Sequence, residues 1–221
     1  IVKGNVGNAE LIEHLIHDYK FDYVFHFAAQ SHVDNSFENS LTFTRDNVYG
    51  THVLIEACRH HLPNVEFVHF STDEVYGESV TDVPFNESET VLKPTNPYSA
   101  SKAAAEMVIR SYIESFNMNI KIIRCNNVYG PNQYPEKVIP KFIQQLKNNE
   151  PVTIQGDGSC VRAFLHAYDT ATAFETILLK GKLGEMTLSV DDLFIVEIKD
   201  KEIFVLPKND KDMHFYGVLR P

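Results

Sequence analysis

Short apolar runs alternate with amphipathic patterns along most of the chain, and this alternation limits the possible folds more than any other feature. Strand-like runs cover residues 22–29, 65–71 and 120–125, with a shorter one at 152–155. Helical patterns cover residues 41–61, 98–116, 138–148 and 167–179. Strands that alternate with helices form parallel βαβ units with helices on both faces of the sheet. The sequence therefore predicts an α/β protein with a doubly wound parallel sheet.

The pattern changes after about residue 185. Apolar runs at 193–198 and 202–206 flank a charged Lys-Asp-Lys segment, which predicts a β-hairpin. We therefore divide the chain into an α/β core, residues 1–185, and an atypical tail, residues 186–221.

Composition argues against several classes of partner. The chain has 30 acidic and 20 basic residues and a formal net charge of -10, whereas nucleic acids and anionic membranes bind basic surfaces. No apolar stretch approaches the ~18 residues that span a bilayer. Three cysteines without Cys-x-x-Cys spacing indicate reduced thiols in a cytoplasmic protein. His26, His69 and His166 lack the spacing of metal ligands, so we expect no metal site.

Chemically capable side chains follow the predicted strands. Parallel sheets bind ligands at the carboxyl ends of their strands, which here are residues 28–31, 71–74 and 125–127. Asp73 and Glu74 come directly after Thr72. Two neighbouring carboxylates in different environments can act as an acid and a base. The simpler alternative is an ordinary acidic loop after a strand.

A tyrosine and a lysine share one face of the helix predicted at 98–116. Tyr98 and Lys102 are one helical turn apart. A nearby ammonium stabilises phenolate and lowers a tyrosine pKa from its usual ~10, so Tyr98 is a candidate general base. The alternative is a tyrosine at a helix start beside a solvated lysine. The Ser71-Thr72 hydroxyls at a preceding strand end favour the catalytic interpretation.

These segments resemble a known enzyme group. Ser-Thr-Asp-Glu-Val-Tyr-Gly at 71–77 and Asn-Pro-Tyr-Ser-Ala-Ser-Lys at 96–102 are similar to motifs of the extended short-chain dehydrogenase/reductases. Within that superfamily they resemble the nucleotide-sugar 4,6-dehydratases of the dTDP-glucose 4,6-dehydratase type. Further matching segments are 27–34, 47–51, 124–130, 134–140 and 156–166. Related epimerases keep the tyrosine and lysine but normally lack the Asp-Glu pair.

The resemblance implies an NAD-dependent lyase with a Rossmann-like core at 1–185 that ends in the start of a nucleotide-sugar lobe. Tyr98 would take the proton of the sugar 4-hydroxyl while hydride leaves C4 for NAD+. Lys102 would hold Tyr98 and the nicotinamide ribose, and Thr72 would hydrogen-bond the 4-oxygen. Glu74 would then remove the C5 proton, and Asp73 would protonate the departing 6-hydroxyl. Hydride would finally return to C6.

The resemblance also implies binding residues and an assembly. The cofactor contacts would be Asn5, Val6, Phe27, Ala28, Ala29, Ser31, Tyr98 and Lys102. The nucleotide-sugar contacts would be Ser31, Thr72, Asn127, Lys137, Val138 and Arg162. Asn5 stands where the family usually has aspartate. The helices at 41–61 and 98–116 would form a homodimer seam, although their apolar stripes equally suit an internal core.

Two departures from the family leave alternatives open. The sequence contains no Gly-x-Gly-x-x-Gly or Gly-x-x-Gly-x-x-Gly, the segment that cradles the cofactor pyrophosphate. We therefore expect that about 50–60 residues of a doubly wound domain are missing before residue 1, so that the first strand has an unpaired edge. The tail after residue 185 also departs from the family's sequence pattern. The alternatives are an inactive truncated fragment or binding module, a UDP-glucose 4,6-dehydratase, or a UDP-sugar epimerase.

Overall fold

The computed structural model describes residues 1–78, 85–87, 90–153, 162–180, 184–188, 194–199, 202–207 and 218–219. It forms two compact units, which are residues 1–125 with 177–187 and residues 126–176 with 188–221. The boundary predicted at residue 185 stays a prediction.

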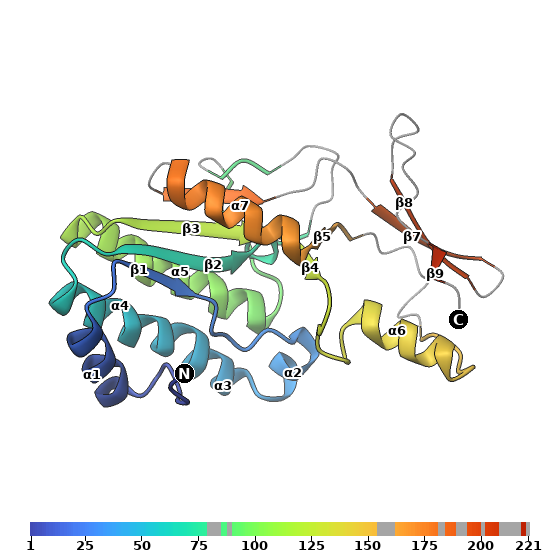
Figure 1. Cartoon of the computed structure of the whole chain (residues 1–221), viewed down its shortest axis with the longest axis horizontal. Helices are drawn as coiled ribbons and strands as arrows, with labels where there is room; N and C mark the ends of the chain where they lie inside the picture. The colour runs from blue at the N-terminus through green and yellow to red at the C-terminus, as the bar shows by residue number, and fades with distance from the viewer. Residues whose placement is uncertain are drawn as a thin grey trace. The chain divides into compact units, whose positions relative to one another are not determined.

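A four-stranded sheet forms the centre of the first unit. Its strand order is β1 (Tyr23–His26), β2 (Glu66–Thr72), β3 (Ile120–Cys125) and β6 (Gly184–Leu188). The β1–β2 and β2–β3 pairs are parallel, as Figure 1 shows. The predicted α/β class with a parallel sheet is confirmed.

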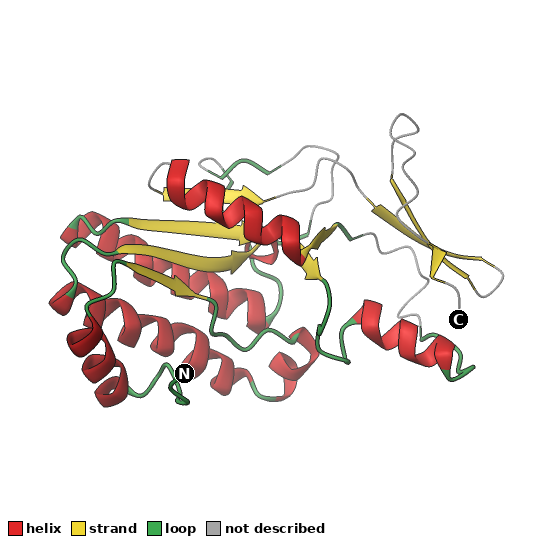
Figure 2. Cartoon of the chain, in the orientation of Figure 1, coloured by secondary structure: helices red, strands yellow, loops and turns green. Residues whose placement is uncertain are grey.

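Helices α1 (Ala9–Tyr19), α4 (Gly50–His61) and α5 (Pro97–Phe116) cover one face of this sheet (Figure 2). Apolar side chains of β2 and β3 pack against those of α4 and α5. The strands contribute Phe67, Ile120 and Ile122, and the helices contribute Leu54, Ile55 and Ile109. On the opposite face, Lys121 Nζ donates to the carbonyl of Leu178 at 2.8 Å, in the last turn of α7 (Ala167–Lys180). Helices therefore contact both faces of the sheet, as the alternating pattern predicts.

The helix predicted at 41–61 is confirmed with an irregularity. It begins as α3 (Ser40–Phe43), passes through the π-helical segment η1 (Thr44–Tyr49) and continues as α4. Helix α2 (Val33–Glu38) precedes it. The π-helical segment carries Asn47, whose side chain contacts the strip after β1 as described below.

The second unit contains a smaller parallel pair, β4 (Asn127–Tyr129) and β5 (Phe164–His166), and helix α6 (Val138–Lys147). The predicted hairpin is confirmed as the antiparallel pair β7 (Phe194–Lys199) and β8 (Glu202–Pro207), to which β9 (Val218–Leu219) adds. The short strand predicted at 152–155 is wrong for residues 152–153, which are irregular, and residues 154–155 lie outside the described part.

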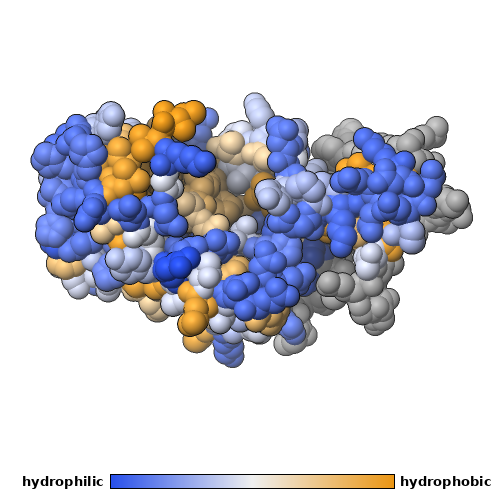
Figure 3. Space-filling view, turned by 90° about the horizontal axis from the view of Figure 1, so that it is seen from below, coloured by the Kyte–Doolittle hydropathy of each residue, from blue (hydrophilic) through white to orange (hydrophobic). Residues whose placement is uncertain are grey.

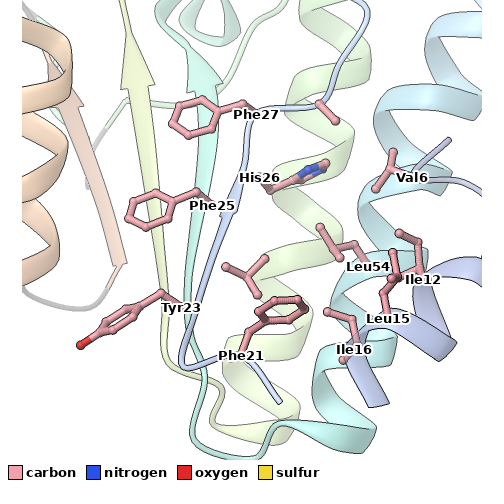
Figure 4. Close-up of a pocket in the computed structure, with 12 residues that line it drawn as sticks. Val6, Ile12, Leu15, Ile16, Phe21, Tyr23, Phe25, His26, Phe27 and Leu54 are labelled. Atoms are coloured by element: carbon pink, nitrogen blue, oxygen red, sulfur yellow. The ribbon is translucent and has the colours of Figure 1, made fainter. Parts of the chain in front are cut away.

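Strand β1 lies at one edge of the four-stranded sheet. Its aromatic side chains Tyr23 and Phe25, and Phe27 just beyond it, are 50%, 41% and 55% exposed. Figure 4 shows these rings on one side of β1, while the residues of α1 and α4 lie on the other. An apolar cavity of ≈ 340 Å³ runs along this edge. Among the described residues, β1 pairs with β2.

The outer surface of the helices is mixed. Figure 3 shows apolar residues exposed among hydrophilic ones on the face that it presents. Within the part of the chain that the structure describes, no helix is both long and apolar enough to cross a membrane.

Candidate active site at the carboxyl end of the sheet

The hydroxyl of Thr72 anchors the carboxylate pair. Thr72 is the last residue of β2, and a 3-10 turn, η2 (Asp73–Tyr76), follows directly. The hydroxyl accepts the backbone N–H of Glu74 at 3.3 Å and donates to Asp73 Oδ1 at 3.2 Å. One short side chain thus fixes both acidic residues at the carboxyl end of β2.

A helix cap brings Glu74 to Tyr98. Asn96 caps α5 by accepting the N–H of Ser99 at 2.8 Å, which places Tyr98 in the first turn. The Asn96 amide also donates to Glu74 Oε2 at 3.0 Å. The carboxylate turn and the start of α5 are therefore joined through one side chain.

Burial makes Asp73 a weaker acid than an ordinary aspartate. Desolvation raises the pKa of Asp73 from 3.8 to about 6, against the lowering effect of the Thr72 hydrogen bond, and the charge of Glu74 raises it further. A carboxyl with a pKa near 6 can hold a proton at near-neutral pH more readily than an ordinary aspartate. This property suits a proton donor.

Tyr98 differs from the sequence-based expectation. The pKa of Tyr98 is raised, because burial disfavours the phenolate and the charges of Glu74 and Asp73 oppose it. A hydrogen bond with Thr72 acts in the opposite direction but does not outweigh these effects. The predicted lowering of this pKa by Lys102 is therefore wrong for the protein as it stands in this structure.

Lys102 explains part of that difference. It shares the helix face of Tyr98, as predicted, but its Nζ donates to the backbone carbonyl of Phe70 at 2.6 Å. Burial lowers the pKa of Lys102 from 10.5 to about 8, although the charge of Glu106 raises it. The ammonium thus lies under the end of β2, where it donates a hydrogen bond to a backbone carbonyl and not to the phenol.

The predicted cofactor strip begins where β1 ends. Ala28, Ala29 and Ser31 are exposed. Since β1 and β2 are parallel, this strip lies at the same edge of the sheet as Thr72. The side chain of Asn47 holds the strip by accepting the N–H of Gln30 at 2.7 Å and donating to its carbonyl at 3.0 Å. Small exposed residues here leave the backbone open to a flat ligand.

The other predicted cofactor contacts lie near the N-terminus. Asn5 Oδ1 accepts the N–H of Gly7 at 2.7 Å, which leaves its second lone pair for another donor. Val6 is half-buried and packs so closely on Gly50 that a Cβ there would lie 2.8 Å from Val6 Cγ1. A side chain at position 50 would therefore displace the Val6 side chain from the start of α4.

Four predicted substrate contacts belong to the second unit. Asn127 begins β4 and pairs in register with Phe164. Lys137 is the N-cap residue of α6, Val138 is its first residue, and Arg162 is exposed two residues before β5. The structure therefore does not place these residues together with the Thr72–Glu74 turn, and their roles stay predictions.

Sequence reasoning missed two polar residues that organise the site. Asn96 binds Glu74, and Asn47 joins the strip after β1 to α5 by donating to Ser101 Oγ at 2.8 Å. Both lie in segments that matched family motifs, and Asn96 directly precedes a proline at a helix start, which is a capping signal. No group of metal ligands occurs among the described residues.

Comparison with known proteins places this arrangement in a family. The family model described as GDP-mannose 4,6 dehydratase matches residues 1–208. The chain belongs to this family. The predicted resemblance to nucleotide-sugar dehydratases of the extended short-chain type is thereby confirmed.

Curated relatives of this dehydratase family are longer than the chain. It is 50% identical over 186 residues to human dTDP-D-glucose 4,6-dehydratase, a match that covers 84% of the chain and 52% of that enzyme. It is equally similar, 50% over 186 residues, to a trifunctional UDP-glucose 4,6-dehydratase/epimerase/reductase of Arabidopsis thaliana, of which it covers 28%. The chain thus spans about half or less of these proteins.

Solved structures give the same fold. A dTDP-glucose 4,6-dehydratase from Streptomyces venezuelae, crystallised with NAD and TYD, matches with a TM-score of 0.79 and 36% identity. That match covers 86% of this chain and 58% of the other. A UDP-glucose 4-epimerase from Thermotoga maritima, crystallised with UDP-glucose, also gives a TM-score of 0.79, at 29% identity, covering 85% and 61%.

Proposed function

We propose that the protein is a dTDP-glucose 4,6-dehydratase that uses NAD to convert its nucleotide sugar to the 4-keto-6-deoxy form. The observation that carries this proposal is the carboxylate pair beside Tyr98. Oxidation at C4 needs one base, whereas elimination across C5 and C6 needs a second base and an acid. Thr72, Asp73, Glu74 and Tyr98 supply these groups within one hydrogen-bonded turn and the adjoining helix start.

The roles follow from the chemistry of each group. Tyr98 accepts the proton of the 4-hydroxyl, and Thr72 hydrogen-bonds the 4-oxygen. Glu74, held by Asn96, removes the C5 proton, which the 4-ketone makes acidic. Asp73, whose pKa is raised to about 6, donates a proton to the departing 6-hydroxyl. Two carboxylates therefore perform opposite proton transfers in one elimination.

NAD fits the residues that this chain contributes. Ala28 and Ala29 present an open backbone beside the end of β2, Asn5 keeps an acceptor for an amine, and Lys102 offers a buried cation near Tyr98. When bound, the nicotinamide supplies the hydride acceptor. Val6, Phe27 and Ser31 complete the proposed cofactor contacts, and Ser31, Asn127, Lys137, Val138 and Arg162 the proposed contacts with the sugar nucleotide.

A UDP-glucose 4,6-dehydratase is the second candidate, because the Arabidopsis relative named for that activity matches as closely as the human dTDP-glucose enzyme. Both nucleotide sugars belong in the same assay. An epimerase is disfavoured, since it needs no second base and acid beside the tyrosine.

We also propose a cytoplasmic homodimer. Two free cysteines, Cys58 and Cys125, are buried, and burial raises the pKa of both thiols to about 12, which suits a reducing compartment. The surface of α4 around His52 and Val53 forms a shallow cavity of ≈ 230 Å³ that a second subunit can fill. Sedimentation of the purified protein over a range of concentrations tests the dimer.

The decisive experiment compares Glu74→Gln with the protein itself. With NAD+ and either nucleotide sugar, we expect Glu74→Gln to form NADH but to lose exchange of the C5 proton with deuterated solvent. Its product formation should fall by about 10²–10⁴-fold, the usual contribution of a general base.

Glu78→Gln is the matched control, because it is the same change at an exposed position four residues later. It should retain full turnover. Unchanged product formation by Glu74→Gln would exclude the role of that carboxylate. No product from the unsubstituted protein with either sugar would exclude the dehydratase function for this chain.

A further inference from the structure

A buried ionic network lies directly behind the carboxylate turn. Arg124 on β3 and Glu106 on α5 are both fully buried, and Arg124 Nη2 lies 2.7 Å from Glu106 Oε2. The Arg124 Nε also donates to both carboxylate oxygens of Glu106 at 3.2 Å. A buried ion pair of this kind is costly to desolvate and is weak evidence for stability alone, so its other contacts matter.

Two further contacts connect this pair to the turn. Arg124 Nη1 donates to the hydroxyl of Tyr76 at 2.8 Å, and the guanidinium carbon lies 4.8 Å from the centre of the Tyr76 ring. Tyr76 is the last residue of η2, the turn that carries Asp73 and Glu74. At the other end of the turn, Ser71 Oγ donates to Glu106 Oε1.

The network therefore holds both ends of the turn from behind. Ser71 precedes the turn, Tyr76 closes it, and both are fixed to one ion pair between α5 and β3. Glu106 is one helical turn beyond Lys102 and two beyond Tyr98, on the same face of α5. A shift of the pair would thus move the carboxylates relative to Tyr98.

We propose that Ser71, Tyr76, Glu106 and Arg124 form a positioning unit that sets the carboxylate pair against Tyr98 for the elimination step. This inference rests on the proposed dehydratase function and assigns to that site residues that never touch the sugar. The oxidation step depends on Tyr98 and Lys102 of α5 and on Thr72, the last residue of β2, whereas Asp73 and Glu74 lie in the turn itself. Loosening the turn should therefore impair elimination more than oxidation.

Tyr76→Phe tests this proposal with the smallest change. It keeps the ring under Arg124 and removes only the hydroxyl. In a single turnover with NAD+ and dTDP-glucose we expect the rate of NADH formation to stay within about twofold of the unsubstituted protein, and C5 proton exchange to be reduced about tenfold or more. Ser71→Ala, which loosens the other end of the turn, should give the same selective loss.

Tyr112→Phe is the matched control. Tyr112 lies on α5, is buried, and donates its hydroxyl to the carboxylate of Glu56 at 2.6 Å, so the same substitution removes a similar charged hydrogen bond away from the turn. It should leave both half-reactions unchanged. Equal loss of both half-reactions in Tyr76→Phe, or the same selective loss in Tyr112→Phe, would overturn the positioning role.

A substrate-free measurement separates this inference from the proposed function. Amide hydrogen exchange should accelerate about tenfold at residues 73–77 in Tyr76→Phe and remain unchanged there in Tyr112→Phe. Gly77 is a sensitive reporter, because its N–H bonds the carbonyl of Glu74 at 3.1 Å. If the protein forms no product, the dehydratase function fails, while unchanged exchange in Tyr76→Phe refutes the positioning unit by itself.

Discussion

The burial of His26 under the sheet predicts that the folded protein loses stability in mild acid. His26 is 3% exposed, and its Nε2 lies 2.8 Å from the Thr51 hydroxyl. Since that hydroxyl donates to the carbonyl of Asn47 at 2.6 Å, it accepts from His26, which therefore carries a proton on Nε2. His69 lies 5.3 Å away, ring to ring, and the charge of Lys102 also opposes protonation.

The magnitude follows from the pKa of His26. Burial, with a contribution from Lys102, lowers this pKa from 6.5 to about 3. Between these values the unfolded chain binds a proton that the folded chain does not, so stability rises with pH in this window and falls on acidification. Between pH 7 and pH 5 the loss is about 2 kcal/mol. This loss depends only on the pKa of His26 in the unfolded chain, provided that its pKa in the folded protein is well below 5.

His26→Gln provides the test, because a glutamine Nε2 can donate to Thr51 but does not titrate. Urea unfolding at pH 7 and pH 5 should show that this variant escapes about 2 kcal/mol of the acid destabilisation that the unsubstituted protein suffers. His14→Gln, the same change at a solvent-exposed position, should keep the full loss. Other titrating groups cancel in the comparison.

One outcome would refute the reasoning about His26. If His26→Gln and the unsubstituted protein lose the same free energy of unfolding between pH 7 and pH 5, His26 is not held neutral by burial. A protonated His26 would then have to face water or a carboxylate, which contradicts its contacts with Thr51 and His69.

Two further substitutions have clear expected results. Gly77 has φ +85, and a Cβ there would lie 2.4 Å from the carbonyl oxygen of Lys93, so Gly77→Ala should lower the free energy of unfolding by about 1–3 kcal/mol in urea titrations. An unchanged midpoint would mean that the 77–93 contact does not persist in solution. Phe25→Lys should reduce concentration-dependent self-association, measured by light scattering, because it places a charge on the open edge of β1, where apolar strands pair readily. Equal scattering by both proteins would exclude that edge as the contact.

The elements of the first unit could be predicted because each has a distinct local pattern. The α5 boundary is an example, since an Asn-Pro cap and a long apolar stripe specify it within a residue. The strand at 120–125 is likewise an apolar run with every residue buried. The π-helical segment at Thr44–Tyr49 has no such local signal, because it depends on how Asn47 contacts Gln30 and Ser101.

The sequence predicted which residues form the site but not how their charges affect one another. Spacing alone puts Tyr98 and Lys102 on one helix face. Whether the ammonium reaches the phenol depends on a competing acceptor, the carbonyl of Phe70, which belongs to a strand packed against the helix. The Arg124–Glu106 ion pair could not be predicted either. The sequence shows one charged residue in a strand and one in a helix, but not that their side chains are in contact.

Protonation of Asp73 offsets part of the effect that raises the pKa of Tyr98. Burial disfavours the phenolate most, the charge of Glu74 comes next, and the charge of Asp73 has the smallest effect of the three. Asp73 must hold a proton to act as the acid of the elimination, and burial already raises its pKa to about 6. Protonation of Asp73 therefore supplies the donor for the 6-hydroxyl and, in the same event, removes a negative charge that opposes ionisation of Tyr98. The acid of the second step thus makes Tyr98 a better base for the first, and the two roles require one protonation state of the site.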